Sequence, residues 1–538
     1  MTLADRLLAE RNERGHWTGY LSSSALSTAT AIMALHLAGN RQDRIDAGLA
    51  WLEKYRNADG GWGDTDRSLS NISTTALCWA AFTLAGRPAP EARAWMLRQT
   101  GSLDPAPLAR AIAARYGKDQ TFSVPILTVL AVAGLVPWSL VPQLPFELAA
   151  LPQSWFRFLQ LPVVSYALPA LIAIGHVRWR KGRGANPVRA LAAPKTLRVL
   201  ESIQPANGGF LEATPLTSFV TISLLAAGYE NNEVIRRGLA FLEASQRPDG
   251  SWPIDTNLAT WLTTLSVNAL GDRLPEKEPI LEWLLNQQYK ERHPFTGAAP
   301  GGWAWTDLPG GVPDADDTSG AVLALARLAP DDPRARAAAA RGIAWLIDLQ
   351  NRDGGIPTFC KGWGNLPFDR SSPDITAHAL QAFQAWQGKL PLDLERRVAK
   401  AKTRATDYLE RVQRPDGAWI PLWFGNQHNA NEENPVYGTA RVLLALDPST
   451  EAYRRGRKWL LAAQREDGSW GSIEETGVAL AAIEDEPARV RAEAWLAQAT
   501  AGEIAPSPIG FYFASLWYHE RLYPLIFALP RHRVTAKS

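Results

Sequence analysis

Three carboxylates stand together in the segment VPDADDTSGAVLAL at residues 312–325, as Asp314, Asp316 and Asp317, directly before an apolar run. One Asp would suffice to cap a helix, because its side chain accepts hydrogen bonds from free backbone N–H groups and suits the positive end of the helix dipole. Neighbouring carboxylates held out of water cannot all ionise without a large free-energy cost. The alternative to a simple cap is therefore an acid whose proton affinity is tuned by its neighbours.

A repeat surrounds this motif and indicates which residues are structural. The unit RRGLAFLEASQRPDGSW at 236–252 returns as RRGRKWLLAAQREDGSW at 454–470, and looser copies begin near residues 47, 196, 340 and 405. Copies of this kind have helical spacing, a Gln, an Asp-Gly or Asn-Gly turn and an aromatic residue. Many of the 22 Trp residues therefore close structural units.

An apolar helix with a Thr near its start follows each of these turns. The aligned Thr residues are Thr28, Thr74, Thr221, Thr260, Thr318, Thr376, Thr439 and Thr476. In this register Thr318 is the constant residue of its copy, and the three Asp residues before it are departures. His378, two residues after Thr376, is another departure. Because buried helices rarely carry ionisable groups without a reason, the register favours a functional role for the Asp cluster and for His378.

The alternation of helix, Gly turn and apolar helix predicts an all-α fold of α/α barrels, with one helix of each pair outside and the apolar helix inside. At 538 residues the chain should form two such domains. We expect a smaller barrel at about 21–214, inserted in a larger barrel that is built from 1–20 plus 215–538 and carries Asp316. The active cavity should lie between the two barrels.

Composition narrows the classes of partner and compartment. The net charge of +2 gives no reason to expect nucleic acid as a partner. The two cysteines, Cys78 and Cys360, cannot form a disulfide framework, which favours a reducing compartment. The N-terminal segment MTLADRLLAERNERGHW has charges where a signal peptide would have its apolar stretch, so we expect a protein that is not secreted.

The repeat is interrupted between about residues 87 and 195. Residues 121–146 carry no charge, a second apolar run spans 158–175, and a basic cluster follows it at 178–183. Prolines at 125, 137, 142 and 145 argue against a straight spanning helix. We expect about 121–175 to dip into one leaflet, with the basic cluster on anionic lipid; a Pro-rich buried helix pair is the alternative. The expected contact residues are Trp138, Leu144, Phe146, Trp155, Phe156 and Phe158.

Four features together resemble the squalene-hopene cyclases, within the class II terpene cyclases. They are the DxDD motif at Asp314 to Asp317, the Gln-to-Trp repeat turns, SPDITAHAL at 372–380 and FYFASLWYHERLYPL at 511–525. The resemblance covers nearly the whole chain, including LVPWSLVPQLPFELAALP at 135–152, which is similar to the membrane-contacting segment of those monotopic enzymes.

This resemblance implies a bacterial, hopanoid-type enzyme that cyclises a linear isoprenoid, squalene or a similar triterpene, after protonating it. No metal or other cofactor is implied. The implied partners are the isoprenoid and the membrane surface on the cytoplasmic side of the cell membrane, where the protein would be peripheral, and a homodimer is left open.

The resemblance also implies roles for single residues. Asp316 would be the proton donor, Asp314 and Asp317 would hold and orient its proton, and His378 would hydrogen-bond the donor and raise its acidity when charged. Asp374 would lie near the solvent side of this network. Rings along the cavity would stabilise cations by cation–π attraction. The matching aromatic and channel positions are Trp305, Phe359, Cys360, Trp423, Tyr437, Phe511, Phe513, Trp517 and Tyr518, with Phe359 and Cys360 as the channel constriction.

Departures from the family pattern leave the product open. Pro125 and Phe219 stand where the family usually carries Trp, and the segment after Gly355 lacks the Tyr and acidic run of hopene formers. The chain is also shorter than typical squalene-hopene cyclases. Product identity is therefore less determined than reaction type.

Other classes share some of these features. A class II cyclase of a prenyl diphosphate would also carry DxDD, but it would need a basic pocket that the sequence does not reveal. A protein prenyltransferase subunit needs an Asp/Cys/His zinc site, for which Cys360 and His378 alone are too few ligands. A non-catalytic lipid-binding barrel would explain the repeats but not the triple carboxylate.

Overall fold

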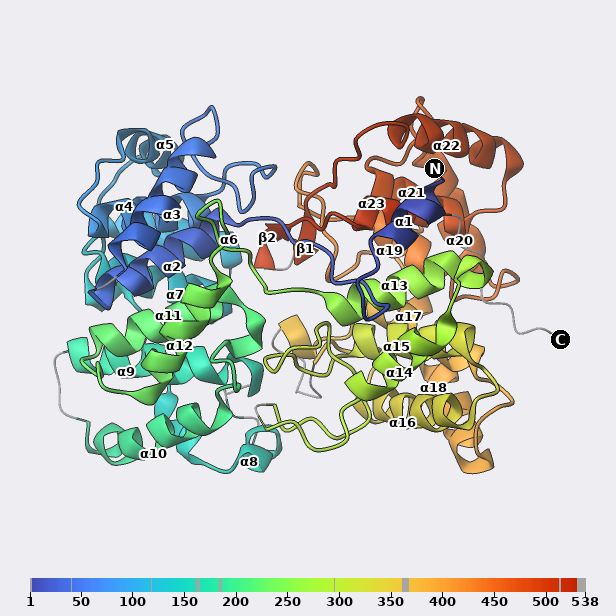
Figure 1. The fold of residues 1–538 in the computed structure, drawn as a ribbon, viewed down its shortest axis with the longest axis horizontal. Helices are drawn as coiled ribbons and strands as arrows, with labels where there is room; N and C mark the ends of the chain where they lie inside the picture. The colour runs from blue at the N-terminus through green and yellow to red at the C-terminus, as the bar shows by residue number, and fades with distance from the viewer. Residues whose placement is uncertain are drawn as a thin grey trace.

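Two closed rings of inner helices, each surrounded by outer helices, make up the fold (Figure 1). The computed structural model describes residues 2–39, 41–117, 119–159, 161, 165–182, 186–294, 296–359, 367–511 and 514–529. Both rings are α-helical, as the repeat predicts, and the antiparallel pair β1 (Ile509–Phe511) and β2 (Leu516–Tyr518) lies between them.

The first ring closes by successive contacts of α2 with α4, α4 with α7, α7 with α9, α9 with α11, and α11 with α2. Its inner helices are α2 (Ala25–Leu37), α4 (Ile72–Leu84), α7 (Gln120–Val132), α9 (Leu168–Lys181) and α11 (Thr214–Ala226). Its outer helices are α3 (Gln42–Lys54), α5 (Pro90–Thr100), α6 (Pro105–Tyr116), α10 (Pro187–Ile203) and α12 (Glu233–Ser245), and the short α8 (Gln153–Phe158) lies beside them.

The second ring closes in the same way, from α13 through α15, α17, α19, α21 and α23 back to α13. These inner helices are α13 (Ala259–Leu270), α15 (Ala315–Leu328), α17 (Pro373–Ala385), α19 (Pro435–Leu443), α21 (Ile473–Ala482) and α23 (Tyr523–Ala528). The outer helices are α1 (Leu3–Ala9), α14 (Lys277–Gln287), α16 (Pro333–Leu349), α18 (Leu392–Arg411), α20 (Glu451–Ala462) and α22 (Glu486–Ala499). The 3₁₀ turns are η1 (Trp138–Leu140), η2 (Phe146–Ala150), η3 (Ser165–Ala167), η4 (Phe210–Glu212), η5 (Gly271–Arg273) and η6 (Pro367–Asp369).

The packing changes between Trp252 and Ile254, not near residue 215. Helices α11 and α12 were expected in the larger barrel, but α11 packs on α2 and α9, and α12 packs on α11. Trp252 belongs to the hydrophobic core of the first ring and Ile254 to that of the second. The ring needs α11 to close, because without it α2 and α9 would expose their apolar faces.

Each repeat turn ties three helices together, and the turn at 246–252 shows how. The indole N–H of Trp252 donates to the carbonyl of Leu242 at 2.7 Å, ten residues earlier, on its own outer helix. The amide of Gln246 donates to the carbonyls of Gly250 and of Arg44, which lies at the start of α3, the neighbouring outer helix. Gly250 has a φ of +89°, and a Cβ there would lie 2.5 Å from the carbonyl oxygen of Ala47, so the turn requires glycine.

A Thr near the start of the inner helix completes the turn. In three copies of the repeat, it is a different Thr from the one that the sequence alignment predicts. Its hydroxyl accepts the backbone N–H of the residue that closes the turn, as Thr318 does from Trp303 at 3.0 Å. In three copies the acceptors are Thr75, Thr217 and Thr263, not Thr74, Thr221 and Thr260. Those copies contain several Thr residues near the helix start, and the length of the connection selects which one faces the turn.

The apolar stretch at 121–175 is mostly core. Helices α7 and α9 are inner helices with buried side chains along most of their length. They therefore match the Pro-rich buried helix pair that was the alternative to a membrane-dipping segment. The expected membrane contacts Phe146 and Phe156 are buried, while Trp138 and Leu144 are partly buried. Among the described residues, no helix combines the length and the apolar character that crossing a membrane requires.

Candidate active site

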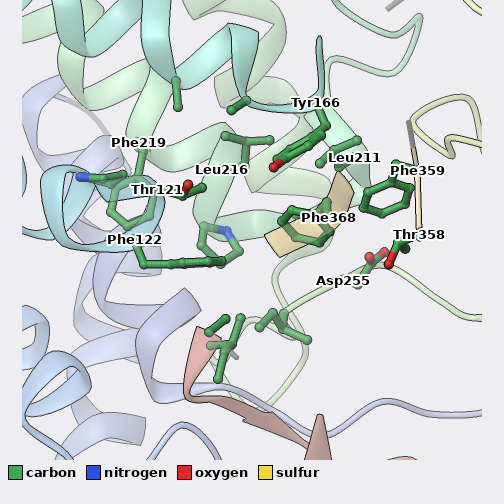
Figure 2. Close-up of a pocket in the computed structure, with 18 of the residues that line it drawn as sticks. Thr121, Phe122, Tyr166, Leu211, Leu216, Phe219, Asp255, Thr358, Phe359 and Phe368 are labelled. Atoms are coloured by element: carbon green, nitrogen blue, oxygen red, sulfur yellow. The ribbon is translucent and has the colours of Figure 1, made fainter. Parts of the chain in front are cut away.

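A cavity of about 700 Å³ lies between the two rings and takes its walls from both. Figure 2 shows part of it, with Phe122 and Phe219 at one side of the view and Asp255, Thr358 and Phe359 at the other. Most lining residues are apolar. The acidic lining residues are Asp255, Asp314, Asp316 and Asp317, and no Lys, Arg or His is among the described residues of the wall.

Asp314 is the N-cap of α15, so helix capping explains this one of the three carboxylates. Its Oδ1 accepts the backbone N–H groups of Asp316 and Asp317, both at 2.9 Å. Burial raises the pKa of Asp314 to about 7. Burial and the charge of Asp314 also raise the pKa of Asp317 well above its usual range. The pair therefore holds at least one proton near neutral pH.

Asp316 is more exposed than its two neighbours and is joined to His378. The Oδ1 of Asp316 and the Nδ1 of His378 lie 2.5 Å apart, across the contact between α15 and α17. The Asp316 side chain is 17% exposed and that of His378 only 3%, so the His lies behind the Asp with respect to the cavity. This arrangement presents a carboxyl group to an apolar space and supports it from behind with a hydrogen-bonding imidazole.

Asp374 stands one helical turn before His378 on α17 and does not line the cavity. Its carboxylate accepts the hydroxyl of Ser372 and, at 3.2 Å, the backbone N–H of Leu422. Burial raises its pKa, and the nearby charge of Asp316 adds to the shift. Asp374 is thus linked electrostatically to the Asp316–His378 pair.

Five aromatic rings form a connected wall beside the acid. Phe359 contacts the rings of Trp305, Trp423, Phe368 and Tyr166, with ring centroids 5.0–6.1 Å apart. The indole N–H of Trp423 donates to the hydroxyl of Thr358 at 2.9 Å, which fixes that ring. Phe219 lines the opposite side of the view in Figure 2. Faces of such rings attract cations.

Two expected cavity aromatics are core residues. Tyr437 is buried against Phe424 at a centroid distance of 4.3 Å, and Phe424 lines the cavity in its place. Trp517 is buried, and its backbone N–H donates to Asp64, while its neighbour Tyr518 reaches the wall. In β2, adjacent side chains point to opposite faces, so only one of the two can face the cavity. Cys360, Phe513 and the side chain of Phe511 lie outside the described residues.

The sequence analysis does not identify several lining residues, among them Trp261, Tyr166, Phe368 and Asp255. Trp261 stands edge-on to His378 at a centroid distance of 6.2 Å, and its indole N–H donates to the hydroxyl of Tyr523 at 2.9 Å. Its position directly after Thr260 in an inner-helix repeat was a signal that could have revealed it. The other three lie in linkers, where no periodicity shows which way they face.

Two family models match the chain in succession. The squalene-hopene cyclase N-terminal domain matches residues 2–187 and the C-terminal domain matches residues 255–508. The second match begins close to the place where the packing changes from the first ring to the second.

Three relatives illustrate the likeness. The chain is 25% identical to the squalene–hopene cyclase of Alicyclobacillus acidocaldarius over 82% of this chain and 76% of that protein. It is 25% identical to enfumafungin synthase efuA of Hormonema carpetanum over 85% of this chain, but it spans only 40% of the length of that fungal protein. A copalyl diphosphate synthase of Streptomyces cyslabdanicus is 31% identical over 40% of this chain and 38% of that protein.

The two domain matches cover most of the sequence and include most helices of both rings and the DxDD cluster. The chain belongs to the squalene-hopene cyclase family.

Proposed function

We propose that this protein is a class II terpene cyclase in which Asp316 protonates an alkene of a linear isoprenoid. The observation that carries the proposal is the position of Asp316: it faces a large apolar cavity, is hydrogen-bonded to His378, and lies between Asp314 and Asp317, a buried carboxyl pair that retains a proton. Alkenes are weak bases, so the acid must be protonated, poorly solvated and close to the carbon.

The reaction begins with transfer of the Asp316 proton to one alkene carbon. The alkene π electrons form the new C–H bond and leave a cation on the adjacent carbon, which the next alkene of the chain attacks to close a ring. The carboxylate left on Asp316 is stabilised by its hydrogen bond to His378. Loss of a proton or addition of water ends the sequence.

The aromatic wall would stabilise the intermediate cations. Cation–π attraction is worth about 0.5–2 kcal/mol per ring, so Trp305, Phe359 and Trp423 together could hold a cation along the path. The apolar lining also excludes water, which would otherwise capture the cation early.

The wall of the cavity favours a neutral isoprenoid. A diphosphate would need cationic partners, and the described lining residues include four carboxyl groups but no cation. Squalene or a similar triterpene is therefore the proposed substrate. The likeness to a copalyl diphosphate synthase over part of the chain keeps a prenyl diphosphate as the second candidate.

We also propose that an apolar contact surface takes the substrate from a membrane, on its cytoplasmic side. This surface consists of five exposed residues: Trp155, Phe158, Leu159, Val188 and Leu191. It is formed by α8 and α10, which lie at the same edge of the first ring in Figure 1. Helix α10 also packs on η2, and only two residues separate η2 from the start of α8. The cavity wall reaches the same region through residues 143–145 and 166–171. Exposed Trp, Phe and Leu side chains suit the lipid interface.

Asp316→Asn tests the proposed chemistry. The detergent-solubilised protein would be incubated with squalene and, separately, with geranylgeranyl diphosphate, and the products analysed by mass spectrometry. The variant should lose about 10³-fold or more of its turnover, because the amide cannot supply the proton. Asp331→Asn, at a side chain that is 80% exposed, is the matched control and should cyclise normally. Cyclisation by Asp316→Asn at the wild-type rate would exclude Asp316 as the acid.

A further inference from the structure

Asp255 and Trp305 place polar groups on the apolar wall outside the DxDD cluster. Asp255 lies in the linker between α12 and α13, where its backbone pairs with Ala213, and its side chain lines the cavity. Trp305 lines the same cavity. The proposed chemistry uses the ring face of Trp305, but neither its N–H group nor the Asp255 carboxyl.

The Trp305 N–H group and one oxygen of the Asp255 carboxyl are without a hydrogen-bond partner among the described residues, while the backbone N–H of Thr256 lies close enough to the carboxyl to lower its pKa. The indole N–H of Trp305 is near enough to Asp255 to lower the pKa of that carboxyl somewhat, but the two groups do not reach hydrogen-bond geometry. Trp305 Nε1 and Asp255 Oδ1 are each buried with no hydrogen-bond partner among the described residues. Leaving a buried polar group unpaired costs about 1–3 kcal/mol, so a pair of such groups on a cavity wall points to a ligand that satisfies both.

A network of hydrogen bonds centred on Glu212 holds the backbone next to Asp255 in place. Glu212 is completely buried, and its carboxylate accepts the amide of Asn207 and the backbone N–H of Gly310, both at 2.7 Å, and the hydroxyl of Thr256 at 3.0 Å. These bonds join the linker at 255–256 to the loop that leads into DxDD. Burial and the charge of Glu212 raise the pKa of Asp255 well above its usual range, which favours the protonated form of this carboxyl.

The donors and acceptors of the pair define what it can bind. The Trp305 N–H group can only donate, so its partner must offer a lone pair. A protonated Asp255 donates from its O–H group and accepts at its other oxygen. A hydroxyl-type oxygen meets both requirements, whereas a hydrocarbon meets neither.

We propose that Asp255 and the Trp305 N–H group form an oxygen subsite in the cyclisation cavity, which holds either a hydroxyl oxygen carried by the isoprenoid or one water molecule. This inference rests on the proposed function, because it adds an oxygen-binding point to the same substrate cavity. If the oxygen belongs to water, that water is placed to end the reaction. Its lone pair forms the C–O bond to the cation and it releases one proton, which replaces the proton given by Asp316.

The first test is a binding measurement that needs no turnover. In the Asp316→Asn background, quenching of tryptophan fluorescence would give Kd for geranylgeraniol and for the hydrocarbon of the same skeleton with hydrogen in place of the hydroxyl. One or two added hydrogen bonds should favour the alcohol by about 3- to 10-fold. Asp255→Leu should remove that preference, while Asp255→Asn, which keeps polar atoms at the same place, should retain part of it. An unchanged melting temperature confirms that each variant is folded.

The second arm identifies the source of the oxygen. Wild-type protein and Asp255→Leu would convert squalene in H₂¹⁸O, and the ¹⁸O-labelled fraction of the product would be compared by mass spectrometry. A labelled alcohol whose fraction falls at least about threefold in Asp255→Leu assigns the site to water; an alcohol preference in binding without labelled product assigns it to the substrate. The subsite is overturned if Asp255→Leu changes neither the binding preference nor the labelled fraction. If wild-type protein converts nothing, the proposed function fails, but the binding arm still decides the subsite.

Discussion

At the scale of single residues, Asp314 both caps a helix and carries a carboxyl group that titrates near neutral pH. It caps α15 through two backbone N–H groups, and burial places its pKa at about 7. A carboxyl whose pKa is raised is neutral below that value and ionised above it. When Asp314 ionises, its negative charge lies two residues from Asp316 and opposes the formation of a second negative charge there, which proton transfer from Asp316 would require.

Turnover should therefore fall as the pH rises through about 7. Initial rates of the solubilised protein between about pH 5 and 9 would measure this. In Asp314→Asn the cap is retained, because Asn is as good an N-cap as Asp, but the titrating charge is gone. The fall near pH 7 should disappear from that variant even if its rate is lower throughout. A wild-type rate that is constant across pH 7, or an Asp314→Asn profile that keeps the same fall, would contradict this role of Asp314.

At the scale of elements, the repeat turn is the unit that holds the rings closed. The turn at 246–252 joins an outer helix to itself through Trp252, to the next outer helix through Gln246, and to an inner helix through Thr28, which accepts the Trp252 backbone N–H at 3.0 Å. Five other buried Trp residues donate their indole N–H to an upstream carbonyl in the same way: Trp17, Trp62, Trp303, Trp419 and Trp470.

Trp252→Phe should destabilise the protein without touching the cavity. The ring is fully buried, so the substitution leaves the Leu242 carbonyl unpaired and should cost about 1–3 kcal/mol of unfolding free energy, roughly several degrees in Tm. Differential scanning calorimetry would measure the shift. Trp155→Phe, at a side chain that is 49% exposed, is the matched control and should change stability by less than about 0.5 kcal/mol. Equal shifts in the two variants would mean that the indole hydrogen bond does not stabilise the turn.

At the scale of the whole molecule, the two rings enclose the cavity between them, and one edge of the first ring carries the apolar contact surface. Large apolar side chains exposed together in this way tend to mark an interaction site. Phe158 and Leu191 are each 85% exposed, the highest values among the exposed large apolar side chains.

The wild-type protein should pellet with lipid vesicles and be released by detergent but not by high salt. Phe158→Ser with Leu191→Ser should weaken this binding about 10²- to 10⁴-fold, because each buried side chain contributes about 1.5–3 kcal/mol. Leu392→Ser with Val490→Ser, which are also exposed but lie on α18 and α22 of the second ring, is the matched control and should pellet like the wild type. Release by salt alone would instead mean that basic residues such as Arg178 and Arg180 dock the protein electrostatically.

The sequence by itself determined the helical repeat, its turn chemistry and the position of the carboxylate cluster. Hydrophobic spacing, Asp-Gly turns and the Gln and Trp that close them are local signals, so they can be read without knowing what lies across the fold. The same register showed that Asp316 and His378 depart from the repeat. The structure places these two within 2.5 Å of each other.

Only the tertiary structure decided where the rings end and which side chains face the cavity. The sequence could not show that α11 closes the first ring, because that depends on its contacts with α2 and α9, far away in the chain. Nor could it show that Tyr437 and Trp517 turn into the core while Phe424 and Tyr518 reach the wall. The proximity of Asp255 to Trp305 is of the same kind: two linkers, 50 residues apart, contribute to one wall, and no local sequence pattern indicates this.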